Sequence, residues 1–147
     1  MIYNHQFILL LIHLISTSLM VGIIWVIQVV HYPSFHFIGN SKYISFQKFH
    51  MERISYIVIP VMLVESISGF LLIYDELKPI LFISMVLLLS IWMLTAFFFA
   101  SVHQKLVSGY EEETVRKLVK INWIRTALWS LRLVLLIIYF TENFING

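Results

Sequence analysis

Four apolar windows constrain the fold of this chain more than any other feature. Each one is long enough to cross about 30 Å of hydrocarbon at a helical rise of roughly 1.5 Å per residue. The windows cover residues 7–30, 54–74, 80–102 and 120–140. Backbone polar groups in lipid must find partners within their own segment, so each window predicts a transmembrane helix. We therefore expect an all-α fold, an integral membrane four-helix bundle, formed as a single domain over residues 1–147.

The composition agrees with a membrane protein and excludes several other classes. Of the 147 residues, 60% are hydrophobic and 12% are charged, which is too apolar for a soluble domain of this size. The absence of cysteine excludes disulfides and thiolate metal sites. A formal net charge of +2 gives no indication of nucleic acid as a partner. No basic stretch or small-residue cleavage site accompanies the first window, so we expect a retained span and a lipid bilayer as the partner.

Lysine and arginine concentrate in two of the three connections between the windows. The first and third connections contain Lys42, Lys48, Arg53, Lys105, Arg116, Lys117 and Lys120. The second connection has only Lys78, and neither terminal tail has any basic residue. Because short cytoplasmic loops are enriched in these residues, the first and third connections are predicted to be cytoplasmic and both termini to lie outside.

Both basic connections are predicted to be helical. Apolar residues after Gly39 recur at helical spacing, and the acidic run Glu111–Glu113 suits the positive end of a new helix. Gly109 is expected to end the third helix. Helices 2 and 4 should therefore extend into the cytoplasm. Tyr32 and Pro33 are expected to break the first helix, and Pro60 to kink the second.

Polar residues within the windows fall into two levels, and the first lies near mid-membrane. The fourth window carries four residues on one helical stripe: Asn122, Arg125, Trp129 and Arg132. At about 1.5 Å per residue, Glu65, Arg132 and His13 lie at nearly one depth, with Thr17 one turn from His13. An unpaired charge in hydrocarbon costs at least a few kcal/mol, so Glu65 and Arg132 are expected to form a structural ion pair. His13 either forms hydrogen bonds only or acts as an axial ligand or proton carrier.

The second level is at the cytoplasmic edge, where His31, His50 and His103 arrive from three different helices. Neutral imidazoles that converge in this way suit zinc, copper or haem iron. The alternative is that each histidine is separately solvated at the membrane interface. His13 and His31 are five helical turns apart on one face, about 27 Å, which would allow one site at each level.

Two haems stacked along the bundle would fit that separation. The arginines Arg53, Arg125 and Arg132 could then receive the haem propionates, because guanidinium groups pair with carboxylates through two hydrogen bonds. Trp92 could line a flat apolar cofactor, although core packing and interface belts are the commoner roles of tryptophan.

Three segments, Leu11–Phe35, His50–Glu65 and Asn122–Arg132, resemble a family of uncharacterised small four-helix bacterial inner-membrane proteins. The family pattern includes the positions of His13, Gln28, His31, His50, Arg53, Glu65, His103 and Arg125. The resemblance implies a multi-pass protein of the bacterial inner membrane, and the distribution of basic residues predicts its N-out, C-out orientation.

The first helix is also similar to that of the four-helix membrane protoporphyrinogen oxidases, which bind haem b. In this chain His13 is followed by Gly22 and Trp25, as a histidine is followed by a stretch with tryptophan and glycine in that family. This second resemblance implies haem b as a cofactor.

These observations favour a haem-b-binding membrane protein acting in electron transfer or oxidoreduction, with one or two haems. His13 would serve one level and His31, His50 or His103 the other, and a quinone or another small redox molecule would be the partner. If the chain is an enzyme, it is expected to be a haem-dependent oxidoreductase.

Two alternatives remain open. The first is a non-haem site for a divalent transition metal, Zn, Cu or Fe, built from His31, His50 and His103. The second is a proton or anion transport or interaction module that uses Glu65 and Arg132. Four spans leave a narrow path within one protomer, so the transport alternative requires a homo-oligomer.

Overall fold

The computed structural model describes residues 2–107 and 109–145, together with their side chains except those of residues 2–4, 40, 100, 103, 104 and 107. Helices dominate, and no strand occurs in this part of the chain. The first rod consists of α1 (Ile2–Val26), the π-helical segment η1 (Ile27–His31), α2 (Tyr32–Ser34) and the 3-10 segment η2 (Phe35–Phe37). The second rod is α3 (Asn40–Asp75). The third consists of α4 (Pro79–Met93), the π-helical segment η3 (Leu94–Phe99) and α5 (Ala100–Val107), and the fourth is α6 (Glu112–Phe144).

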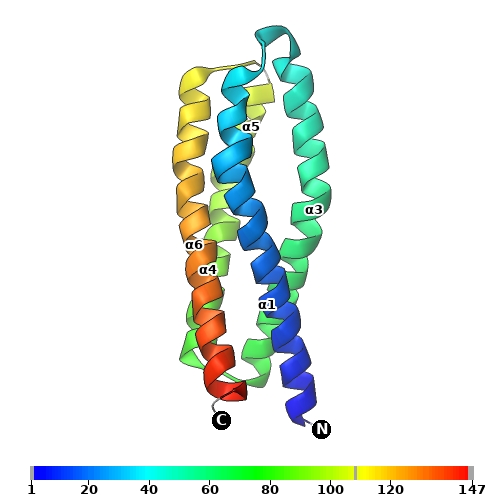
Figure 1. Cartoon of the computed structure of the whole chain (residues 1–147), viewed down its shortest axis with the longest axis vertical. Coiled ribbons are helices and arrows are strands. Elements are labelled where there is room, and N and C mark those ends of the chain that lie inside the picture. The colour runs from blue at the N-terminus through cyan, green and yellow to red at the C-terminus, as the bar shows by residue number, and fades with distance from the viewer. Residues whose placement is uncertain (1, 108, 146–147) are drawn as a thin grey trace.

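The four rods form an elongated bundle (Figure 1). The first rod packs against α3 and α6, and α4 packs against α6 and α3. Both chain termini lie at one end, which we call the terminal end, and the connections before α3 and α6 lie at the other, the distal end (Figure 1). Four helical stretches are long and apolar enough to cross a membrane: His5–Phe37, Ser41–Asp75, Pro79–Phe99 and Glu112–Phe144. The prediction of an all-α bundle with four helices long and apolar enough to cross a membrane is confirmed.

The surface and the interior have the polarity of a membrane protein. Large apolar side chains such as Ile8, Leu63, Val86 and Ile137 are exposed on all four rods. The interior instead holds buried polar side chains, including His13, Thr17, Glu65, Ser68, Ser84, Asn122, Arg125 and Arg132. Because lipid solvates apolar surface while the bundle interior must satisfy polar groups, this arrangement suits a bilayer.

Three apolar clusters fill the core along the bundle axis. The terminal cluster includes Leu10, Leu72 and Leu136. The middle cluster includes Met20 and Trp129, and a third, aromatic cluster lies at the distal end. A layer of buried polar residues lies on the same four helices between the terminal and middle clusters.

The connections match the predicted helices at most positions. Gly39 is the N-cap of α3, and Glu111 is the N-cap of α6 with two further glutamates in its first turn. Gly109 has a φ of +154° just beyond α5, where the third rod ends. The first rod differs, because it passes through Pro33 and ends only at Phe37. Proline is tolerated there because it occupies the first turn of α2, where its missing N–H is not needed.

Candidate functional site

Glu65 on α3 is the centre of the buried polar layer. Its Oε1 accepts a hydrogen bond from Thr17 Oγ1 on α1 at 2.9 Å, and its Oε2 accepts one from Trp129 Nε1 on α6 at 3.3 Å. The guanidinium of Arg132 forms an ion pair with Glu65 Oε1, and both side chains are fully buried. Arg132 Nε also donates to the backbone carbonyl of Ser84 on α4 at 2.9 Å. All four rods therefore contribute to one network.

His13 completes this network as a neutral imidazole. Its Nδ1 lies 2.9 Å from Ser68 Oγ, while the Ser68 hydroxyl lies 2.7 Å from the carbonyl of Val64, to which it donates. Since a serine hydroxyl has one proton to give, Ser68 must accept the hydrogen bond from His13 Nδ1–H. His13 Nε2 then has a lone pair, and it faces Arg132 Nη2 at 3.4 Å. This assignment gives every donor in the contact an acceptor.

The side chain of His13 is closely packed. Both ring nitrogens already have partners, and Gly69 lies so close that a Cβ there would be 2.8 Å from His13 Cε1. His13 lines neither of the two cavities described below. Its geometry is that of a hydrogen-bonding group, and its role as an iron ligand stays a prediction.

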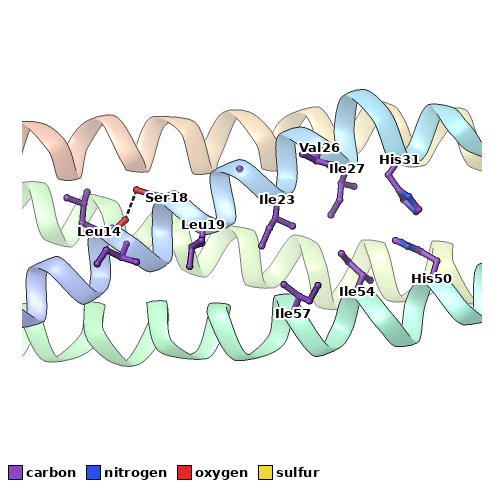
Figure 2. A pocket seen from close by; sticks show the side chains of 12 residues that line it. Leu14, Ser18, Leu19, Ile23, Val26, Ile27, His31, His50, Ile54 and Ile57 are labelled. Atoms are coloured by element: carbon purple, nitrogen blue, oxygen red, sulfur yellow. Dashed lines mark hydrogen bonds between the residues drawn. The ribbon is translucent and has the colours of Figure 1, made fainter.

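The distal end holds a second group of polar residues, beginning with His31 on η1 and His50 on α3. Their rings stack with centroids 3.8 Å apart and planes 28° apart, and Phe35 and Phe46 pack around them. Figure 2 shows the two imidazoles pointing toward each other at one end of a cavity between α1 and α3. His31 Nε2 is buried and has no hydrogen-bond partner among the described residues.

The cavity beside these histidines has a volume of about 750 Å³. Apart from the imidazoles and Ser18, its walls are aliphatic, and Leu19, Ile23 and Ile57 lie along its length (Figure 2). The hydroxyl of Ser18 is engaged with the carbonyl of Leu14 at 2.7 Å. Nε2 of His31 is therefore a polar atom that a molecule in this cavity could bind.

Arg125 lies on α6 behind the histidines, and its side chain is only 6% exposed. Its guanidinium lies over the rings of Phe99, at 4.2 Å, and Trp129, at 5.2 Å. Its Nη1 donates a long hydrogen bond of 3.4 Å to Asn122 Oδ1, and the guanidinium also interacts with the hydroxyl of Tyr32. Asn122 in turn donates to Gln28 Oε1 at 2.7 Å, so a chain of polar side chains links α6 to η1.

A second cavity, of about 380 Å³, lies between α3, η3 and α6. Arg125, Tyr32 and His50 contribute polar groups to its wall, together with Ser55, Trp92 and Thr95. The indole of Trp92 donates to Ser66 Oγ at 2.9 Å, so Trp92 is held in place at the cavity edge.

Arg53 and His103 are the remaining predicted site residues. Arg53 is exposed, and its guanidinium lies 5.3 Å from the centroid of the Phe49 ring. The side chain of His103 lies outside the described residues, so its predicted place with His31 and His50 stays a prediction. Among the described residues, no group of three histidine, aspartate or glutamate side chains could hold a metal ion.

Sequence reasoning missed several members of the buried polar layer. Ser68 follows Glu65 by three residues and so shares its helix face, which was the available signal. The contact between Trp129 and Glu65 had no such signal, because it depends on how α3 and α6 are rotated about their axes. The carbonyl of Ser84 could not be found from sequence, since every residue has one.

Comparison with known proteins adds no assignment: no family model matches the chain, and no curated protein or solved structure is similar to it. The resemblances to small bacterial membrane proteins and to haem-binding oxidases stay predictions. The function has to be argued from the geometry.

Proposed function

We propose that this chain is a bacterial inner-membrane protein that binds haem b at the distal end of the bundle, with His31 as the ligand to iron. The observation that supports this is the buried Nε2 of His31, which has no hydrogen-bond partner among the described residues and lies at the end of an apolar cavity of about 750 Å³. A buried polar nitrogen without a partner is costly, and a neutral imidazole nitrogen is a common ligand of haem iron. Cavities of roughly 300–1,000 Å³ are typical of cofactor sites.

The chain's own residues would bind and orient such a cofactor. His50 stacks against His31 and fixes the plane of its ring. Leu19, Ile23 and Ile57 supply an apolar wall that excludes water from the porphyrin faces. Haem supplies one-electron redox chemistry when bound, so we propose electron transfer or oxidoreduction with a membrane quinone as the class of partner.

The buried polar layer around Glu65 and Arg132 has a structural role in this proposal. The Glu65–Arg132 pair is fully buried, its hydrogen bonds are made within the layer, and it lines no cavity in the described part of the chain. An ion path would need an opening beside these groups. We therefore propose that the pair holds the four rods together.

The distal end is proposed to face the cytoplasm. The basic residues of the two connections lie on the helices at that end, whereas Lys78 lies at the terminal end. Under the preference of basic residues for the cytoplasmic side, the termini are outside and the haem site lies in the inner half of the bilayer.

Absorbance spectroscopy tests the haem proposal. The full chain would be expressed with ample haem supply, purified in mild detergent, and measured as a dithionite-reduced minus oxidised difference spectrum. The control variant His36→Ala removes an exposed histidine whose Nδ1 contacts Tyr110 at 2.8 Å, outside the cavity. We expect Soret and α bands in the parent chain and in His36→Ala, and their loss in His31→Ala.

A ligand exchange distinguishes loss of iron coordination from loss of folding. His31→Met is expected to keep bound haem with a shifted spectrum, because a thioether can replace an imidazole at iron. The absence of bands in the parent chain, or bands that persist unchanged in His31→Ala, would exclude His31 as the ligand.

A further inference from the structure

Arg125 carries a buried positive charge that has no role in the haem proposal. Its guanidinium is buried, yet no carboxylate of the described residues lies within ion-pair distance, and its Nε has no hydrogen-bond partner there. Its contacts are aromatic faces and the neutral oxygens of Asn122 and Tyr32. Arg132 on the same helix has Glu65, so the described residues supply a counter-charge for Arg132 and none for Arg125.

The cavity beside Arg125 lacks acidic groups. None of the described residues that line it is aspartate or glutamate, while Arg125 is cationic. The hydroxyls of Ser55 and Thr95 on the same wall donate to the backbone carbonyls of their own helices, so Arg125 is the main group there that can bind an anion. A desolvated cation is stabilised strongly by an anion that forms charge-assisted hydrogen bonds with it, so the chemistry of this wall selects a negative ligand.

The rest of the cavity is apolar and reaches the lipid-facing surface. Its wall includes Val58 and Met62 on α3 and Phe99 on η3. Two further lining residues, Ile59 on α3 and Ala96 on η3, are exposed on the outside of the bundle. A molecule whose charge reached Arg125 could therefore keep an apolar chain in the bilayer, between α3 and η3.

We infer that this cavity binds the anionic head of a membrane amphiphile, a carboxylate or a phosphate, with Arg125 as its counter-charge. Arginine suits this role because its planar guanidinium presents paired donors to either group. Thr95, Ala96 and Phe99 all come from the single π-helical segment η3. Such segments place extra residues within one turn and are frequent at functional sites.

Direct binding tests this inference on the full chain in detergent, prepared without haem. The probe is tritiated oleate in a scintillation proximity assay, with unlabelled competitors. We expect saturable binding of oleate and competition at least about tenfold weaker from methyl oleate, which has the same chain without the charge; tenfold corresponds to roughly 1.4 kcal/mol.

Further competitors identify the source of the head group. Competition by phosphatidylglycerol but not by phosphatidylcholine would show that a phospholipid phosphate is accepted, whereas competition by oleate alone would restrict the site to carboxylates. Inorganic phosphate is expected to compete poorly, because it lacks the chain that the apolar wall binds. Equal competition by methyl oleate and oleate would refute an anion site.

Matched variants locate the binding. Arg125→Met should weaken oleate binding at least about tenfold, while Arg53→Met, which removes an exposed arginine outside the cavity, should leave it unchanged. Ala96→Trp fills the mouth of the cavity and keeps the charge, so it should also abolish binding even if Arg125→Met does not fold. Binding that survives in a folded Arg125→Met, or in Ala96→Trp, would overturn the inference.

One variant separates this inference from the haem proposal. His31 lines the first cavity and not the second, so His31→Ala is expected to lose haem and keep oleate binding. Loss of oleate binding with retained haem, in Arg125→Met, would be the complementary result.

Discussion

Arg125 and Arg132 lie about two helical turns apart on the buried stripe of α6, and their surroundings determine their roles. Arg132 has a carboxylate, a backbone carbonyl and an imidazole around it. Arg125 has aromatic rings and neutral oxygens. A buried charge without its partner is more costly than the intact pair is stabilising, so the two residues should respond differently to substitution.

Glu65→Gln is predicted to destabilise the bundle strongly. The amide oxygen can still accept a hydrogen bond from Thr17 or Trp129, but Arg132 becomes an uncompensated buried charge, which costs about 3–5 kcal/mol. Unfolding in mixed SDS micelles, followed by circular dichroism, measures this free energy. Combining it with Arg132→Met should destabilise less than the sum of the two single changes, because no lone charge remains.

The matched control breaks an exposed ion pair on the same helix. Arg116 pairs with Glu112 one turn away, and both side chains are largely exposed. Arg116→Gln should leave the free energy of unfolding unchanged, because exposed pairs contribute little. A Glu65→Gln variant as stable as Arg116→Gln would show that the buried pair does not hold the bundle.

Individual contacts could be predicted from the sequence only where the depth of the residues in the membrane was enough to bring them together. A rise of about 1.5 Å per residue placed Glu65, Arg132 and His13 at one level, and the structure brings all three together. Which hydrogen bonds His13 makes at that level was not predictable, because this depends on how the helices are rotated about their axes. Its engagement by Ser68 and Arg132 changes an imidazole that suits iron into one whose nitrogens are both occupied.

Among the elements, the two π-helical segments had no recognisable signal in the sequence. Apolar length predicted the spans, and the glycine and acidic positions predicted where α3 and α6 begin. However, η1 and η3 each change the helical phase, so sequence spacing does not show which residues on either side of them share a helix face. They border the two cavities and carry His31 and Thr95, which is why the cavities could not be drawn from spacing alone.

Gly69 of α3 lies where this helix packs closely against its neighbours. A Cβ at this position would meet His13 Cε1 at 2.8 Å and Met85 Sδ at 3.0 Å. Met85 can move, but His13 is held on both sides by hydrogen bonds. We expect Gly69→Ala to destabilise the bundle by about 1–3 kcal/mol, as overpacking usually does.

Gly22 of α1 is the control, because nothing lies within 4 Å of the Cβ that alanine would add there. Gly22→Ala should stabilise the helix by up to about 1 kcal/mol through its higher helix propensity. Both variants are measured by the same SDS titration. Equal stability of Gly69→Ala and Gly22→Ala would mean that α1 and α3 can separate at this contact without loss.

The orientation of the whole bundle in the membrane determines on which side the basic connections and the two cavities lie. The bundle has its basic connections at the distal end and its termini at the other. Both cavities include His50, which lies on the distal part of α3, so both reach the distal half of the bundle, although the first also extends along α1 to Leu14. If that half is the inner one, haem and amphiphile ligands would reach the protein from the cytoplasmic leaflet.

Cysteine labelling measures this orientation cleanly, because the chain has no cysteine of its own. Ser45 is exposed near the distal end, and Glu142 is exposed near the terminal end. In intact spheroplasts treated with a membrane-impermeant maleimide, we expect Glu142→Cys to react and Ser45→Cys to react only after lysis. Ser84→Cys, buried in the polar layer, should react in neither state. The reverse pattern would place the basic connections outside, contrary to their preference for the cytoplasm, and would move both proposed ligand sites to the outer leaflet.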